Sequence, residues 1–292
     1  MAAKRLAPTV AALSLLARYG GGVAHDAAGR QARARRRPPA PRPTAALIVA
    51  FNQERRIEGT VRAALAIPGV DLALVIDDGS TDATQRTARD AGAVVVRNPR
   101  RQGRAAALEV GAAIIAMRDE ANVEPRNLLL LDGALGVSAA GAAPLVDAVS
   151  RRVADLAIAV FEPLDERFRG AAATFARRAI ERESGWLPAQ PLSRVRCLTR
   201  EALNAALPLA RGAGVDPGMT IDVLRAGLAV TEIECLIPVR PAPLGAGGAL
   251  VHANQYRDVM IAINARRLRR GFEATQHAFD SRTGRTLEEE QP

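Results

Sequence analysis

Two short polar turns, each following an apolar run, hold the residues best suited to chemistry in this chain. The first run starts near Ala46 and ends in Phe51-Asn52-Gln53-Glu54, and the second ends in Asp77-Asp78-Gly79-Ser80-Thr81-Asp82. Each run predicts a buried strand, and each turn predicts the start of a following helix. Because ligands of an open α/β sheet bind at the carboxyl ends of its strands, the two turns together predict one wall of a binding cleft.

The acidic pair Asp77 and Asp78 suits the recognition of a nucleotide. A carboxylate at a strand end can accept a hydrogen bond from the imide N–H of uracil or from a ribose hydroxyl. The alternative is a structural role, in which the carboxylates lie at the N-terminus of the next helix and favour its dipole. Asp82 fits that alternative, with Ser80 or Thr81 as the N-cap of a helix over 81–91.

A third polar element, Gln102-Gly103-Arg104, opens another predicted helix. The glycine permits a close approach of the backbone to a ligand, and the planar fork of arginine matches the oxygens of a diphosphate. We therefore interpret Arg104 as a nucleotide contact. A solvated arginine in an arginine-rich chain is the alternative, and the sequence supports both equally.

These residues need a scaffold, which the rest of the pattern predicts. After Thr44, strand segments alternate with helical ones, and this indicates an α/β fold with a mostly parallel central sheet flanked by helices. The predicted strands cover 45–51, 71–77, 93–97, 127–132, 154–160 and 228–236, with a short segment near 195–198. The predicted helices cover 54–66, 81–91, 102–119, 141–152, 169–183 and 249–270, with two more opened by Thr199 and by the loop from Gly212. We divide the chain into a basic arm (1–43), one domain (44–270) and a disordered tail (271–292).

The net charge of +9 is concentrated in the arm. Residues 1–44 hold Lys4 and eight arginines against Asp26, a net +8, which leaves +1 for the rest of the chain. With only 3% aromatic residues for base stacking, this distribution argues against a nucleic-acid partner. No apolar run approaches the roughly 18–20 residues of a membrane span. We expect a cytoplasmic protein whose arm either contacts anionic lipid at the inner membrane face or is a solvated tail.

The two polar turns resemble the family 2 glycosyltransferases, whose strands commonly end in Tyr/Phe-Asn-Glu-Glu and Asp-Asp-Gly-Ser-x-Asp. A later segment, Gly212-Ala213-Gly214-Val215-Asp216 followed by Thr220-Ile221-Asp222, resembles the family's Gly-x-Gly-(Val/Ile)-Glu and Ile-Asp elements. The similarity spans about residues 44–270 and is closest to the polyprenyl-phosphate-sugar and glucosyl-phosphoglycerate synthase type. It implies the GT-A type of nucleotide-sugar-binding fold.

The resemblance also implies a reaction, the transfer of a sugar from a nucleotide-diphosphate donor to a phosphate-bearing or lipid-linked acceptor. It implies that Phe51, Asn52 and Glu54 flank the base. It places Asp216 where inverting members have the base that deprotonates the acceptor, although a plain acid at a helix N-terminus is an equal alternative. Arg240 lies where related enzymes present basic residues to the acceptor phosphate.

One motif departs from the family. Its members end a strand in Asp-x-Asp, two carboxylates that hold Mg²⁺ or Mn²⁺ against the sugar diphosphate. Here the strand over 127–132 ends in Asp132-Gly133-Ala134, which leaves Asp132 as the implied metal ligand, with His252 as either a helper or a structural residue. We favour a weakly metal-assisted transferase. The alternative is a non-catalytic nucleotide-sugar-binding protein with a scaffold or regulatory role.

A dinucleotide-dependent oxidoreductase is a poor alternative. Such a protein needs a G-x-G-x-x-G turn after its first strand, and the first strand here ends in Phe51-Asn52-Gln53-Glu54.

Overall fold

The structure, a computed structural model, describes residues 42–119, 124–161, 170–238 and 250–269. The arm before Arg42, the tail from 271 and Arg240 lie outside these residues. The lipid contact predicted for the arm therefore stays a prediction.

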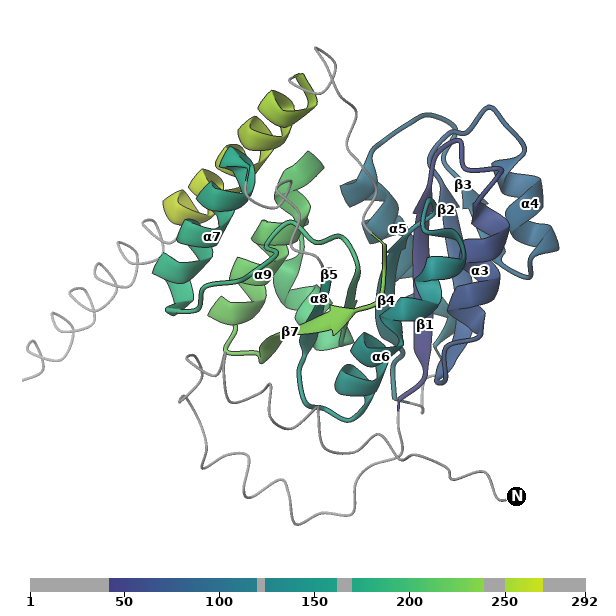
Figure 1. Cartoon of the computed structure of the whole chain (residues 1–292), viewed down its shortest axis with the longest axis horizontal. Coiled ribbons are helices and arrows are strands. Elements are labelled where there is room, and N and C mark those ends of the chain that lie inside the picture. The colour runs from purple at the N-terminus through teal and green to yellow at the C-terminus, as the bar shows by residue number, and fades with distance from the viewer. Residues whose placement is uncertain (1–41, 120–123, 162–169, 239–249, 270–292) are drawn as a thin grey trace, which may run out of the picture. The chain divides into compact units, whose positions relative to one another are not determined.

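A seven-stranded sheet in the order β3-β2-β1-β4-β6-β5-β7 organises the described residues (Figure 1). Its strands are β1 (Thr44–Ala50), β2 (Val70–Asp77), β3 (Val94–Arg97), β4 (Asn127–Asp132), β5 (Leu156–Phe161), β6 (Arg196–Leu198) and β7 (Val230–Cys235). Neighbouring strands are parallel except at β6, which pairs antiparallel with both β4 and β5. The mostly parallel α/β fold expected from the alternating sequence pattern is confirmed.

Helices connect the strands and cover the sheet. They are α3 (Ile57–Leu65), α4 (Thr84–Asp90), α5 (Arg104–Arg118), α6 (Ala143–Ser150), α7 (Ala171–Ser184), α8 (Arg200–Ala206), α9 (Val215–Arg225) and a helix over 250–269, with short 3₁₀ turns η1 (Gly136–Ala142) and η3 (Gly212–Gly214). In the described part of the chain, no helix is both long and apolar enough to cross a membrane.

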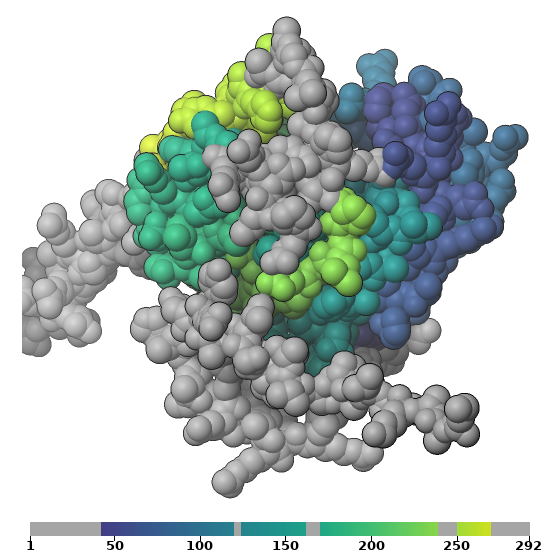
Figure 2. All heavy atoms as spheres, viewed as in Figure 1, coloured from purple at the N-terminus to yellow at the C-terminus, as the bar shows by residue number. Residues whose placement is uncertain are grey.

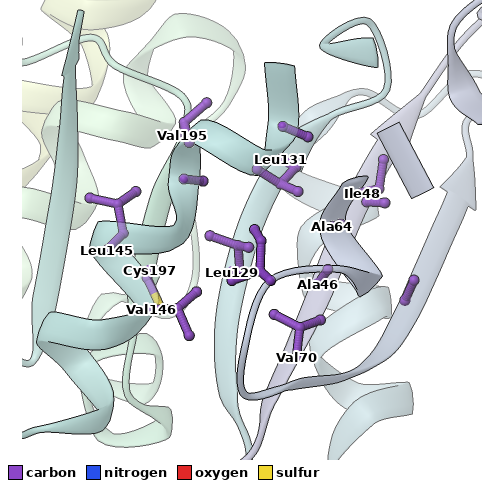
Figure 3. Packing of buried hydrophobic residues seen from close by; sticks show 14 of the residues in the cluster. Ala46, Ile48, Ala64, Val70, Leu129, Leu131, Leu145, Val146, Val195 and Cys197 are labelled. Carbon is purple, nitrogen blue, oxygen red and sulfur yellow. The ribbon is translucent and has the colours of Figure 1, made fainter. Parts of the chain in front are cut away.

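The two faces of the sheet carry separate hydrophobic cores, because successive side chains of a strand point to opposite faces. On one face, Ala46 and Ile48 of β1 and Leu129 and Leu131 of β4 pack with α3 and α6 (Figure 3). On the other face, the alternate residues of the same strands pack with α5, α8 and α9. Both faces of these central strands are buried, which explains why their sequences are continuously apolar.

A third, smaller cluster joins the helix over 250–269 to α7. Val259 and Ile263 pack against alanines of α7, and the rings of Phe175 and Tyr256 meet edge to face at 5.7 Å. Figures 1 and 2 show this helix, in yellow-green, lying along α7 at the surface.

Helix α4 begins three residues later than the sequence predicts. Helix α4 starts at Thr84 without a side-chain cap, rather than at Ser80 or Thr81. The Ser80 hydroxyl instead accepts from the Asn52 amide, and the Thr81 amide and hydroxyl donate to Asn52 Oδ1 in the turn after β1. Side chains that would have capped a local helix are used to join two turns that lie about thirty residues apart in sequence.

The close approach of β1 and β4 depends on Gly133. A Cβ atom at this position would lie 2.9 Å from the Ala50 Cβ and 3.2 Å from the Ala50 Cα. Gly133→Ala is therefore expected to lower the free energy of unfolding by about 1–3 kcal/mol, since both strands are fixed by the cores. Urea denaturation measures the loss, and Ala116→Ser on the exposed side of α5 is the control, with a change within about 0.5 kcal/mol. An unchanged midpoint for Gly133→Ala would show that the strand ends can separate freely.

Candidate functional site

The turns after β1 and β2 are joined by a set of backbone-to-side-chain hydrogen bonds. The Asn52 amide donates to the Ser80 hydroxyl over 2.9 Å, and the Thr81 amide donates to Asn52 Oδ1 over 2.9 Å. Asn52 has a positive φ of 51°, a conformation that asparagine tolerates better than most residues. The two turns therefore form one joined surface at the carboxyl edge of the sheet, and its role as one wall of a binding cleft stays a prediction.

Glu54 and Asp82 complete this connection. Asp82 Oδ2 accepts from the Glu54 amide, and Glu54 Oε2 accepts from the Ala83 amide, each over 3.2 Å. Asp82 Oδ1 also accepts from the Thr84 amide at the start of α4, over 3.0 Å. Asp82 thus has the structural role that the sequence favoured for it. Glu54 and Asn52 are exposed at the edge and can face a ligand.

Asp78 fixes the loop that leads into α5. Its buried carboxylate accepts hydrogen bonds from Asn98 Nδ2 over 3.0 Å and from the amides of Gln102 and Gly103, each over 2.8 Å. Burial by itself would raise the pKa of Asp78, but these hydrogen bonds outweigh it, and the pKa is lowered from its ordinary value. Asp78 therefore holds the loop from Asn98 to Gly103 in place beside the joined turns.

Asp77 is also buried, and it closes its own turn. Its Oδ1 accepts from the Ser80 amide over 3.0 Å, and its Oδ2 lies 3.8 Å from Arg97 Nε. In the two loops nearby, the guanidinium of Arg101 stacks on Phe51, 4.2 Å from its ring centre. Such a stack offers a flat apolar and cationic surface beside the two turns.

Asp132 and Arg194 face each other at the end of β4. The antiparallel register pairs Leu130 with Arg196, so that continuing it by two residues sets Asp132 opposite Arg194. Arg194 Nη1 lies 2.9 Å from Asp132 Oδ2, with 50% of the Arg194 side chain and 30% of the Asp132 side chain exposed. The sequence-predicted metal ligand is therefore ion-paired with an arginine.

The described residues do not fit a divalent ion held by the protein in the manner of Asp-x-Asp. Asp132 is followed by Gly133 and Ala134, neither of which has a side-chain oxygen, and one Asp132 oxygen already faces a guanidinium. Within the described ranges, no group of three His, Cys, Asp or Glu residues could hold a metal ion. His252 is exposed on the helix over 250–269, where it lines a small surface hollow with Leu192 and Gln255.

Asp216 lies in the first turn of α9, buried between two arginines. Arg104 Nη1 donates to its Oδ1 over 2.8 Å, and Arg196 Nε lies 3.5 Å from the same oxygen. Arg104 Nη2 also donates to the Arg194 carbonyl over 2.9 Å, so one chain of contacts joins Asp132, Arg194, Arg104, Asp216 and Arg196. We call these five residues the arginine network.

Burial controls the electrostatics of this network. Burial lowers the pKa of Arg104, and it lowers the pKa of Arg196, whose side chain has 0% exposure, to about 10. In both cases the negative charge of Asp216 opposes this shift. Arg196 donates further hydrogen bonds to the Ser193 carbonyl, the Pro191 carbonyl and the Thr220 hydroxyl. These hydrogen bonds offset the cost of removing the Arg196 charge from water, which would otherwise destabilise the fold.

The structure thus brings the predicted residues into two groups. Phe51, Asn52, Glu54, Asp77 and Asp78 gather around the joined turns, while Arg104, Asp132 and Asp216 belong to the arginine network. Sequence reasoning missed Arg101, Arg194 and Arg196. Arg194 and Arg196 lie just before and at the start of the three-residue strand β6, a segment too short for its pattern to signal them.

Comparisons with known proteins agree with this geometry. The profile of the family described as "Glycosyl transferase family 2" matches residues 45–115, the segment that holds both joined turns. No curated protein sequence matches the chain. The chain has the GT-A type fold of the family 2 glycosyltransferases, and the resemblance inferred from the sequence is confirmed.

Among solved structures, the chain is similar to glucosyl-3-phosphoglycerate synthase from Mycobacterium tuberculosis. The complex with Mg²⁺ and uridine diphosphate is 28% identical over 77% of this chain and 79% of that one, with a TM-score of 0.61. The complex with Mn²⁺, uridine diphosphate and glucosyl-3-phosphoglycerate is 27% identical over 76% and 80%, with a TM-score of 0.60. The complex with Mn²⁺, UDP-glucose and glycerol 3-phosphate is 25% identical over the same shares, with a TM-score of 0.60.

Proposed function

We propose that this protein is a glycosyltransferase that moves a hexose from a nucleotide-diphosphate donor to a phosphate-bearing acceptor. The observation that carries the proposal is the position of the arginine network, next to the joined turns of a GT-A type sheet. The similar synthases, which bind uridine diphosphate or UDP-glucose together with phosphoglyceric acid or glycerol 3-phosphate, support the same substrate classes.

Within this proposal, the joined turns receive the nucleoside. Phe51, Asn52 and Glu54 line the outer edge, and Asp77 and Asp78 hold the turn and the loop into α5 in place beneath it. The arginine network lies toward the diphosphate and the transferred sugar. Arg240, proposed for the acceptor phosphate, lies outside the described residues.

The role proposed for Asp216 as the base stays a prediction. A base needs an oxygen that can reach the acceptor hydroxyl, and Asp216 Oδ1 is already held by Arg104 with Arg196 close by. Asp216 would therefore have to leave Arg104 or Arg196 before it could deprotonate an acceptor hydroxyl. This observation favours a second candidate function, a protein that binds the nucleotide sugar without efficient transfer.

The metal also stays a prediction. The Mg²⁺ and Mn²⁺ of the similar synthases support a divalent ion for this class of protein. Because the described residues do not fit the two-carboxylate site, no step of the proposal passes through a metal, and Asp132 remains the residue at which a metal would be tested.

One experiment separates the candidates. The full chain is melted with uridine, guanosine, adenosine and cytidine diphosphates, and nucleoside diphosphate release is then assayed with the matching sugar donors and with 3-phosphoglycerate or glycerol phosphate as acceptor. One nucleotide should raise the melting temperature by several degrees when present at about 100 times its Kd, a stabilisation of about 2.7 kcal/mol.

The outcomes are distinct. A thermal shift with release that depends on the acceptor supports the transferase. A shift without release supports the binding-only alternative. The absence of a shift with every nucleotide would contradict both.

A further inference from the structure

We infer that Arg194 is a diphosphate-binding residue, and that it supplies at the donor phosphates the positive charge that a metal held by Asp-x-Asp would supply. This inference rests on the proposed function and deepens it, because it names the group that holds the donor. It also predicts that nucleotide binding does not require a divalent ion.

The first support is the position of Arg194. The register of β4 and β6 sets it opposite Asp132, the residue at which the family places the first metal ligand. Its guanidinium lies 2.9 Å from the Asp132 carboxylate, and a divalent ion would have to approach that same carboxylate. The cation already at this strand end is therefore an arginine.

The second support is the balance of charge. The arginine network holds three guanidiniums and two carboxylates; Glu232, which also acts on Arg196, has Arg177 as a further cation, so one positive charge remains in excess. An excess of positive charge attracts a diphosphate and repels a divalent ion. Replacement of the family's second acid by Ala134 moves the balance in the same direction.

The third support is accessibility. Arg196 is fully buried, and Arg104 is nearly so and committed to Asp216 and to a backbone carbonyl. Arg194 is the member of the network with half of its side chain exposed, while its carbonyl is held by Arg104. A backbone fixed in this way presents a guanidinium fork to a ligand at a defined place.

The fourth support is the small cost of exchanging partners. An exposed ion pair such as Arg194–Asp132 contributes little to stability. Phosphate oxygens bind arginine through short, charge-assisted and often bidentate hydrogen bonds. Arg194 can therefore turn from the Asp132 carboxylate to a diphosphate with a net gain.

The test measures uridine diphosphate binding by calorimetry, in EDTA and in excess Mn²⁺. For the natural chain, we expect the Kd in EDTA to lie within about threefold of the Kd in Mn²⁺. Arg194→Ala should weaken binding in EDTA by about tenfold or more, and Arg194→Lys, which keeps the charge without the fork, should lie between the two. Arg178→Ala, the same change on the exposed side of α7, should leave both values unchanged.

The carboxylates give the reciprocal test. Asp132→Asn removes the competing partner of Arg194, so binding in EDTA should be unchanged or tighter. Ala134→Asp restores a second carboxylate, so binding in EDTA should weaken and binding in Mn²⁺ should strengthen. Thermal melts of each variant verify that it is folded.

Three outcomes would overturn the inference while leaving the proposed function intact. The first is binding that occurs only with Mn²⁺. The second is an unchanged Kd of folded Arg194→Ala in EDTA. The third is tighter binding of Arg194→Ala in Mn²⁺, which would mean that Arg194 only blocks a metal site. Failure of the natural chain to bind the nucleotide in either condition would instead contradict the proposed function itself, provided that the other nucleotides of the panel also fail.

Discussion

Replacing Asp216 with asparagine is expected to lower the free energy of unfolding by about 3–5 kcal/mol, the cost of breaking a buried ion pair from one side. Asp216 is the carboxylate shared by Arg104 and Arg196, and Arg196 has no exposed surface. In Asp216→Asn, the guanidiniums of Arg104 and Arg196 would lie buried beside each other without the negative charge of Asp216 Oδ1. Urea denaturation at neutral pH measures the loss.

A second substitution distinguishes the charge effect from a loss of packing. Arg196→Met removes the buried cation but keeps a long apolar side chain, so the pair Asp216→Asn with Arg196→Met should be more stable than Asp216→Asn alone. The coupling between the two positions, taken from a double-mutant cycle, should exceed about 1 kcal/mol. Additive effects would mean that the two residues do not share an ion pair. A loss below about 1 kcal/mol in Asp216→Asn would mean that water reaches the network.

Asp78→Asn is expected to destabilise the fold by about 2–4 kcal/mol at neutral pH. Hydrogen bonds to a charged acceptor contribute about 1.5–3 kcal/mol each, and an amide placed here turns one N–H toward the donors of the loop. The carboxylate holds Asn98, Gln102 and Gly103, so its loss should also loosen the loop that carries Arg101. Protease sensitivity of that loop is the second readout.

The effect of Asp78→Asn should depend on pH. The pKa of Asp78 is lower in the folded chain than the ordinary value near 4, so its contribution is fully present above about pH 5. This contribution is lost as the pH falls through the pKa of Asp78 in the folded chain. The difference in the free energy of unfolding between the natural chain and Asp78→Asn should therefore narrow below about pH 4. Asp90→Asn, an exposed acid at the end of α4, is the control. If this difference in the free energy of unfolding widened on acidification, the ionised Asp78 carboxylate would not be the source of the stability.

The role of Asp78 in the fold also changes how the site should be tested. Replacing Asp77 and Asp78 with alanine would remove the bonds that hold the turn and the loop, so a loss of nucleotide binding would not identify a contact. Substitutions at Phe51 or Arg194 reach the two groups of site residues more directly, because neither side chain closes a buried turn.

Local sequence signals were enough to predict the strands, the polar turns after β1 and β2 and the order of helices, but not the hydrogen bonds that join the two turns. They work because a buried parallel strand is a continuous apolar run and because polar residues follow at its carboxyl end. Helix α4 starts later than predicted, since Ser80 and Thr81 bond to Asn52 in another turn. Contacts between turns distant in sequence are not visible in a local capping pattern.

The contacts of the arginine network could not be predicted from the sequence, for a different reason. Arg194 and Arg196 lie in a three-residue strand and its approach, too short for periodicity to indicate a face or a partner. Their pairing with Asp132 and Asp216 depends on β6 running antiparallel between β4 and β5. An arginine-rich composition hid them further, because most arginines in such a chain are solvated.

The reversed strand β6 has a consequence for how the chain acquires its site during folding. The nucleoside half comes from residues 44–118, where neighbouring strands are also close in sequence, and such segments assemble early because little chain entropy is lost. Arg194 follows Asp132 by 62 positions in the sequence, and it reaches Asp132 only after β6 has been inserted between β4 and β5, two strands that are synthesised before it. Synthesis from the N-terminus therefore yields the surface proposed for the nucleoside first and the arginine proposed for the diphosphate last. A nascent chain stopped before β6 would contain both joined turns and Arg104, but neither Arg194 nor Arg196.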